Sequence, residues 1–227
     1  MSWRLLALLV VTALGAAEPV RPYFSARPGA LEKSRALIAA GDETARLALK
    51  KLVADADKAM AVEPPSVTAK AKVPPSGDKH DYLSLAPYFW PDPSKPDGLP
   101  YVRRDGQVNP ESRDEAANDT LRMRLLGKSV ETLGLAYYFT KDERYAAHAA
   151  RLLRVWFLAP ETRMNPRLRF AQAVAGKNDG RGTGILESRY VGFAADAAGL
   201  LQGSPAWTET DRRQLDQWLG VFLDWLL

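Results

Sequence analysis

The sequence has 227 residues, of which 46% are hydrophobic and 26% charged, the composition of an ordinary globular protein. It contains no cysteine, which excludes a disulfide scaffold, a zinc–cysteine site, an iron–sulfur cluster and a thiol nucleophile. With only 2 histidines a multi-histidine metal centre is not expected, and the formal net charge of +4 suits an acidic ligand without demonstrating one.

The first residues have the pattern of a secretory signal peptide. A short basic start, Met1–Arg4, precedes the apolar run Leu5–Leu14, and small residues follow at Gly15–Ala17. We therefore predict a signal peptide over residues 1–17 and a periplasmic or secreted mature protein; a buried N-terminal helix is the alternative. No later run is long enough to span a bilayer, so we expect no membrane contact after cleavage.

Apolar residues at helical spacing predict a mainly α fold made of helix pairs. The first pair is Pro28–Ala40 and Asp42–Ala61, broken at Gly41. Later helices are predicted at Ser112–Thr140, Ala146–Trp156, Val191–Leu201 and Leu215–Trp225. Capping boxes are expected at Ser112 with Glu115, Thr140 with Glu143, and Thr208 with Asp211. No run alternates convincingly between apolar and polar residues, so strands should be scarce.

One long segment, Val62–Glu111, lacks helical periodicity and holds 10 of the 16 prolines. Its first part, Glu63–Pro75, has the composition of an extended linker. Its middle, Asp78–Asn109, carries all five aromatic residues of the segment, and disordered linkers are poor in such residues, so it is predicted to be an ordered functional loop.

Two smaller features have competing interpretations. The run Gly180–Gly184 before a helix could bind phosphate, but it lacks the Lys and the preceding strand of a nucleotide-binding loop. A tight glycine turn that presents Arg181 is favoured instead. His148 lies among alanines and is interpreted as structural, whereas His80, in the long loop, is either functional or locally structural.

The long loop combines aromatic residues with cations. Sugar rings present apolar faces to Tyr and Trp, and uronic acids add a carboxylate that Lys or Arg can bind. Nucleic acid would also use aromatic and basic residues, but it would normally bring a larger basic excess, so no nucleic-acid partner is expected.

Several multi-residue runs resemble the alginate lyase domain family. The longest is GDKHDYLSLAPYFWPDP, at Gly77–Pro93, and it is followed in the family's order by runs near Asn109–Glu111, Thr162–Pro166, Phe170–Ala173 and Asp179–Gly184. The resemblance implies an incomplete (α/α) toroid of antiparallel helical hairpins with one long aromatic and proline-rich loop. It also implies a lyase that cleaves alginate or a related polyuronate by β-elimination, with no metal or cofactor.

The resemblance also implies site residues. The expected substrate-binding residues are Lys79, His80, Tyr82, Tyr88, Trp90, Gln172, Arg181 and Arg189, with Tyr and Trp stacking on sugars and the others positioning uronate groups. The family's catalytic Asn-His pair, Tyr and Arg are not matched, and we expect them downstream of Leu227. The domain over residues 18–227 is therefore expected to be truncated and inactive alone. A second departure is Glu187–Tyr190, where an Asp-Thr-Arg-His run is expected.

Two other functions remain open at this point. One is a non-catalytic α-helical domain that binds a glycan or a peptide. The other is a glycoside hydrolase on a similar toroid, which would need two opposed carboxylates among the acidic residues of the loops.

Overall fold

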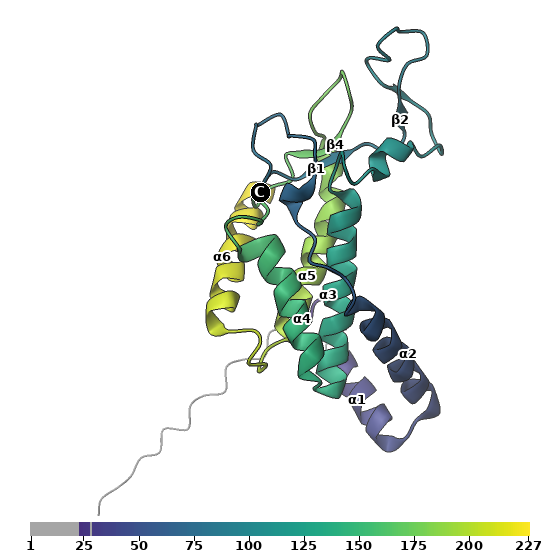
Figure 1. The fold of residues 1–227 in the computed structure, drawn as a ribbon. Coiled ribbons are helices and arrows are strands. Elements are labelled where there is room, and N and C mark those ends of the chain that lie inside the picture. Colours follow the sequence, from purple (N-terminus) through teal and green to yellow (C-terminus); the bar gives the residue numbers. More distant parts are fainter. Residues whose placement is uncertain (1–22, 28) are drawn as a thin grey trace, which may run out of the picture.

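A computed structural model describes residues 23–27 and 29–227, and the predicted signal peptide lies outside them. The described residues form six α-helices and four short strands, so the prediction of a mainly α fold is confirmed. The helices run side by side in alternating directions, and the long irregular segments gather at one end of the bundle (Figure 1). We call this end, made by residues 60–119 and 154–188, the loop end. None of the described helices is long and apolar enough to cross a membrane.

The first two helices form the predicted hairpin. Helix α1 covers Ala30–Ala40 and α2 covers Glu43–Ala59. Between them Gly41 adopts a φ of 87°, a left-handed conformation that glycine reaches without steric cost. Asp42 then caps α2, because its carboxylate accepts a 2.8 Å hydrogen bond from the amide of Ala45.

Helix α3, Thr120–Thr140, begins later than the capping-box pattern predicted. Ser112 does not cap a helix, because its hydroxyl donates to the carbonyl of Asn109 at 2.7 Å within the short 3₁₀ helix η2, Pro110–Arg113. The next helix, α4, covers Glu143–Leu153, and its cap is Asp142 rather than Thr140. The hydroxyl of Thr140 instead donates to the carbonyl of Ala136 in the preceding turn.

Helices α5 and α6 follow a second irregular segment. Helix α5 covers Arg189–Leu200, and α6 covers Glu209–Leu226. The predicted capping box of α6 is confirmed, with Thr208 and Asp211 bonded reciprocally. A π-helical turn, η3 at Arg154–Leu158, directly follows α4, and α6 packs against it. There the indole of Trp218 donates a 2.7 Å hydrogen bond to the carbonyl of Met164.

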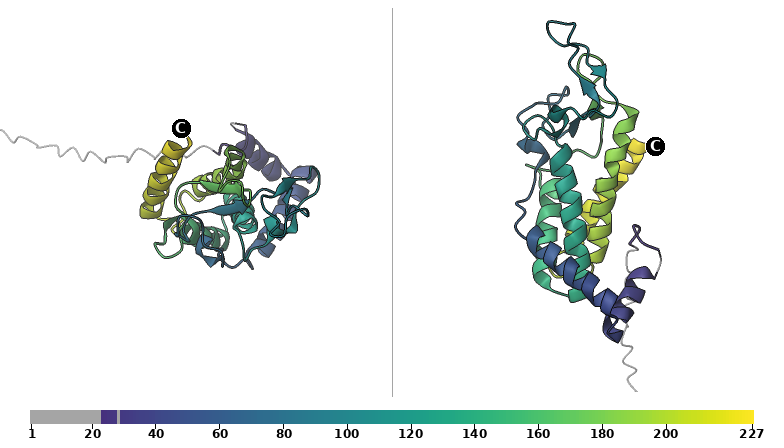
Figure 2. Two further views of the ribbon diagram at one scale, coloured as in Figure 1. Left: turned by 90° about the horizontal axis from the view of Figure 1, so that it is seen from above. Right: turned by 90° about the vertical axis from the view of Figure 1, so that its right-hand side faces the viewer.

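The core centres on α3, which packs against α2, α4 and α5 (Figure 2). Two glycines on α3 allow α5 to approach closely. A Cβ atom at Gly127 would lie 3.0 Å from the Cβ of Tyr190, and one at Gly134 would lie 3.2 Å from the Cα of Ala197. The Leu, Ala, Trp and Phe side chains at the predicted helical spacing fill the rest of this core.

The strands are few and short, as predicted, and all lie at the loop end. Strand β1, Leu83–Leu85, pairs in parallel with β4, Phe170–Ala173. Strand β2, Phe89–Trp90, pairs antiparallel with β3, Val102–Arg103, in a projecting hairpin (Figure 1). The predicted loop at 78–109 is therefore ordered, and strand pairing orders it.

The segment Glu63–Pro75 is not simply the extended linker that its composition predicted, because part of it is helical and buried. It contains the 3₁₀ helix η1, Val67–Ala69, and the fully buried Lys70. The ammonium of Lys70 lies 2.9 Å from Asp119 at the start of α3 and donates to the carbonyls of Val67 and Lys79. Burial of the pair raises the pKa of Asp119 to about 6, against the opposing charge of Lys70.

Candidate substrate-binding site

The buried carboxylate of Glu187 organises the polar side chains of the loop end. Glu187 lies in the 3₁₀ helix η4, Gly182–Ser188, and is 9% exposed. Its Oε2 accepts hydrogen bonds from the hydroxyl of Tyr82 at 2.5 Å and from that of Ser84 at 2.8 Å. Its Oε1 lies 3.4 Å from the Nε2 of Gln172. We call Tyr82, Ser84, Gln172, Arg181 and Glu187 the Glu187 cluster.

Gln172 and Arg181 form the outer part of this cluster. The guanidinium of Arg181 forks onto Gln172, with Nε donating to the main-chain carbonyl at 3.0 Å and Nη2 to Oε1 at 2.8 Å. It also lies 5.0 Å from the ring centre of Phe89. Gln172 has a φ of 53°, which is unfavourable for a residue with a side chain. The structure thus brings together two of the predicted binding residues, with one of them in a strained conformation.

The glycine-rich run beside Arg181 is not the tight turn that was predicted: Arg181 is extended, with φ −139° and ψ 154°, and Gly182–Gly184 form the start of the 3₁₀ helix η4. A Cβ atom at Gly180 would lie 1.9 Å from the carbonyl oxygen of Arg169, and one at Gly184 would lie 2.5 Å from the Cβ of Ala171. The run must therefore contain glycine at both positions for η4 to lie against β4. This close approach is what carries Arg181 to Gln172.

Burial governs the protonation of the cluster. It raises the pKa of Glu187, while the hydrogen bonds from Tyr82, Ser84 and Gln172 oppose that shift. Burial and the neighbouring carboxylate also raise the pKa of Tyr82, which therefore stays a neutral donor. Gln172 and Arg181, both partly exposed, form the outer part of the cluster, and each has N–H donors beyond those directed at Glu187 or Gln172. Such a pair suits an acceptor with negative charge.

The expectation that Tyr82 stacks on a sugar ring is corrected. Its side chain is 1% exposed, and the phenol is turned inward to Glu187. Tyr82 therefore supports the site from beneath.

Lys79 and His80 lie at a different part of the loop end. Lys79 is exposed, and His80 is partly exposed. The Nδ1 of His80 lies 2.6 Å from the carbonyl of Arg163. Because a carbonyl can only accept, we assign the proton of the neutral ring to Nδ1, which leaves Nε2 as an acceptor. The neighbouring Asp81 is buried and accepts two hydrogen bonds from Arg167, at 2.7 and 2.8 Å.

The predicted stacking residues Tyr88 and Trp90 are carried by the β2–β3 hairpin. Tyr88 is 41% exposed. Trp90 is partly buried, donates to the carbonyl of Gln107 at 2.9 Å and lies 5.6 Å from the guanidinium of Arg104. Their role in stacking stays a prediction.

Arg189 is exposed at the start of α5. It lies close to Glu187 in sequence, but its hydrogen bond is to a residue outside the Glu187 cluster. Its guanidinium donates to the hydroxyl of Tyr190 at 2.7 Å and lies 4.7 Å from that ring. This local contact, rather than a salt bridge between helices, fixes the side chain. Its predicted contact with substrate stays a prediction.

Sequence reasoning missed Ser84 and Glu187. Ser84 stands within the run that carries the family resemblance, and Glu187 within the segment where the sequence departs from the family pattern. Neither position carries a local signal of burial. Only the pairing of β1 with β4 brings the two residues together.

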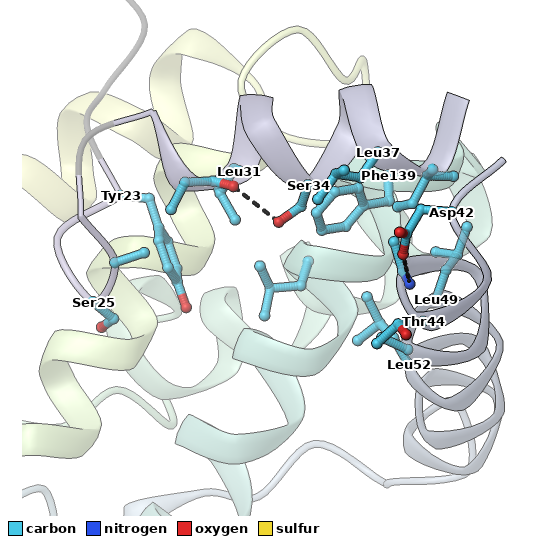
Figure 3. A pocket seen from close by; sticks show the side chains of 16 residues that line it. Tyr23, Ser25, Leu31, Ser34, Leu37, Asp42, Thr44, Leu49, Leu52 and Phe139 are labelled. Carbon is cyan, nitrogen blue, oxygen red and sulfur yellow. Dashed lines mark hydrogen bonds between the residues drawn. The ribbon is translucent and has the colours of Figure 1, made fainter. Parts of the chain in front are cut away.

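Two pockets differ sharply in character. A pocket of about 570 Å³ lies between α1, α2 and α3, far from the cluster in sequence, and its lining is mostly apolar, with Leu31, Leu49 and Phe139 prominent (Figure 3). A groove of about 420 Å³ lies at the loop end, where Leu83, Leu85 and Ala173 line it and Lys72 and Lys177 contribute cations. Ser84 points to Glu187 while its neighbours in β1 line this groove, so the strand pair separates the groove from the cluster.

The described residues contain no group of three or more His, Cys, Asp or Glu side chains placed to hold a metal ion. The donors of the Glu187 cluster are likewise unsuited to a cation, because its one carboxylate is buried beneath hydroxyl groups. The arrangement can bind and orient an anion.

Antiparallel helical hairpins that carry their polar residues on loops at one end define the class of this molecule, an α/α-hairpin domain with its candidate site at the loop end. A model of one family in this class, described as alginate lyase, matches residues 66–227. The chain belongs to the alginate lyase family.

A solved relative shares this fold. The crystal structure of an alginate lyase from Bacteroides ovatus superimposes with a TM-score of 0.81 at 44% sequence identity, over 86% of this chain and 51% of that one. The chain therefore spans about half the length of this relative. No curated protein sequence matches the chain.

Proposed function

We propose that this chain contributes the polyuronate-binding part of a polysaccharide lyase that cleaves alginate or a related polymer by β-elimination. Membership of the alginate lyase family supports the class of reaction. The observation that carries the binding role is the partly exposed Arg181–Gln172 pair. Arg181 donates two hydrogen bonds to Gln172, the amide nitrogen of Gln172 lies 3.4 Å from the buried Glu187, and both groups have further N–H donors beyond these contacts.

The chemistry explains why such donors are needed. The proton at C5 of a uronate is α to the carboxylate and only weakly acidic, so negative charge develops on the carboxylate as the proton leaves. Donors held in place before the reaction stabilise that charge most effectively. Arg181 and Gln172 would bind the uronate carboxylate in this way. The base that removes the proton and the acid that protonates the leaving oxygen are not assigned to any residue of this chain.

The exposed Tyr88 and the partly buried Trp90 at the β2–β3 hairpin support the same proposal. Tyr88 and Trp90 would contact the apolar faces of sugar rings, while Lys79, His80 and Arg189 would position further uronate groups. Export of the protein, inferred from residues 1–17, would place it where such polymers occur. Sequencing the N-terminus of the secreted protein checks this, with Glu18 expected first.

Incubation with alginate separates the proposal from its alternatives. Elimination creates an unsaturated uronate that absorbs ultraviolet light, and hydrolysis creates reducing ends without that absorbance. A chain that binds alginate without either product would support the non-catalytic binding function. Ultraviolet absorbance produced by the 227-residue chain alone would contradict the expectation that its catalytic residues lie elsewhere. Failure to bind oligouronates would contradict the proposed site.

A further inference from the structure

Glu187 holds Gln172 at two points. At the side chain, the Oε1 of Glu187 faces the Nε2 of Gln172 at 3.4 Å. At the main chain, the amide of Gln172 donates to the hydroxyl oxygen of Ser84 at 2.7 Å, and that hydroxyl donates in turn to Oε2 of Glu187 at 2.8 Å. One buried carboxylate thus fixes both the backbone and the side chain of a residue whose φ is 53°.

The same contacts decide which way the Gln172 amide points. Arg181 can only donate, so the atom of Gln172 that it contacts must be the oxygen. Glu187 accepts the hydroxyl protons of Tyr82 and Ser84 at one oxygen, so its other oxygen is available to accept from the Gln172 nitrogen. The amide is therefore oriented from both ends, and its second N–H proton is used by neither neighbour.

We propose that Glu187 is a positioning residue that holds the amide of Gln172 as a hydrogen-bond donor to a uronate carboxylate. The inference rests on the proposed function, in which Gln172 and Arg181 contact that carboxylate. Glu187 itself is buried beneath Tyr82 and Ser84 and has no direct contact with ligand in this role. Its effect on binding passes through Gln172.

The substitution Glu187→Gln tests this with little change of shape. If the new amide oxygen keeps the hydrogen bonds of Tyr82 and Ser84, its nitrogen faces the nitrogen of Gln172, donor against donor. If the new amide turns over, its nitrogen meets the hydroxyl of Ser84, which already accepts from the Gln172 main chain. The first arrangement removes the hydrogen bond to the Gln172 side chain, and the second removes the acceptor of the Ser84 hydroxyl proton, whose oxygen holds the Gln172 main chain.

The experiment is a double-mutant cycle in the full chain, with binding of an alginate oligosaccharide of defined length measured by calorimetry. We expect Glu187→Gln to weaken binding about tenfold in the natural background. In the Gln172→Ala background the same change should alter binding less than about twofold, because the residue that transmits the effect is gone. Equal weakening in both backgrounds, or no weakening in the first, would overturn the proposal.

A matched control separates positioning from general destabilisation. Glu131, in the middle of α3, also accepts a hydrogen bond from a tyrosine, Tyr23, and burial also raises its pKa. Glu131→Gln should leave oligosaccharide binding within about twofold of the natural chain. Weakening as large as that of Glu187→Gln would show a loss of folded protein instead of a local effect.

A measurement without ligand distinguishes failure of this inference from failure of the proposed function. The side-chain amide protons of Gln172 should exchange slowly with solvent in the natural chain and faster in Glu187→Gln, as followed by NMR. If the natural chain binds no oligouronate while this difference is observed, the proposed function fails and the positioning stands. Equal exchange in both chains overturns the positioning itself.

Discussion

The hydroxyl of Tyr82 donates a 2.5 Å hydrogen bond to the carboxylate of Glu187, and both groups are buried. Tyr82 immediately precedes β1, and Glu187 lies near the end of η4. The bond therefore joins two loop segments that are remote in sequence. It also supplies one of the donors that allow a carboxylate to remain beneath the surface.

Tyr82→Phe should destabilise the protein by about 1–3 kcal/mol, because it removes a donor from a buried acceptor without changing the ring. Urea unfolding of the two chains measures this difference. Tyr101→Phe is the matched control, since Tyr101 makes a 2.8 Å hydrogen bond to Glu111 in an exposed setting. The control should cost less than about 0.5 kcal/mol. Equal costs would show that burial of Glu187 does not set the effect.

Gln172 allows stability and binding to be separated. Gln172→Gly and Gln172→Ala both remove the side chain, but only glycine relieves the strain of the 53° φ. The glycine variant should therefore be more stable than the alanine variant by about 1 kcal/mol. Both should bind an alginate oligosaccharide about tenfold more weakly than the natural chain. Thermal unfolding and calorimetry provide the two readings, and an alanine variant as stable as the glycine variant would refute the strain.

Two glycines of η4 should respond differently to substitution by alanine. A Cβ at Gly184 would lie 2.5 Å from the Cβ of Ala171, whereas a Cβ at Gly182 would meet nothing within 4 Å. Gly184→Ala should cost about 2 kcal/mol and weaken oligosaccharide binding, because η4 must move away from β4. Gly182→Ala should change stability by less than about 0.5 kcal/mol. Similar behaviour of the two variants in urea unfolding would contradict this packing.

Asp211 gives the stability a defined acid dependence. Burial opposes its charge, but hydrogen bonds from Arg154 and Thr208 prevail and lower its pKa from 3.8 to about 2. A carboxylate with a lowered pKa in the folded state stabilises the protein above its unfolded pKa, and this contribution is lost as the pH falls through the folded pKa. The loss should occur between about pH 4 and pH 2 and amount to about 1 kcal/mol after allowance for solvent screening.

Asp211→Asn should remove this part of the acid dependence. Stability measured by urea unfolding across that pH range should fall less steeply in the variant than in the natural chain. Asp142→Asn is the comparison, because Asp142 caps α4 and pairs with Arg144 in an exposed setting. Asp142→Asn should reduce the slope of stability against pH less than Asp211→Asn does. An unchanged curve for Asp211→Asn would rule out the assignment.

Local patterns in the sequence predicted where the helices lie. They did not predict features that depend on contacts between residues remote in sequence. The apolar stripe from Leu215 to Trp225 identified α6, and Thr208 with Asp211 identified its start, because both patterns depend on neighbours within a few residues. Ser112 has the same local pattern as Thr208, but its hydroxyl bonds to Asn109, so no helix begins there. Where a side chain has two available hydrogen-bond partners, sequence spacing alone does not predict which one it binds.

Only part of the candidate site was predicted from the sequence, again because contacts remote in sequence form the rest. The family resemblance indicated Gln172 and Arg181, which the structure brings into contact. It could not indicate that Tyr82 points inward or that Glu187 lies beneath Gln172, because these arrangements follow from the parallel pairing of two strands of three and four residues. Such short strands have no period that a sequence can display.

The parallel pairing of β1 with β4 also has a kinetic consequence. The whole of α3 and α4 lies between these strands in sequence, so closing the pair costs least entropy once that helical hairpin has packed. We expect the loop end to form late in folding. Substitutions such as Gly184→Ala should then accelerate unfolding and leave the refolding rate nearly unchanged. The part of the molecule proposed to contact substrate would be the first to open, and the helical hairpins could persist without it.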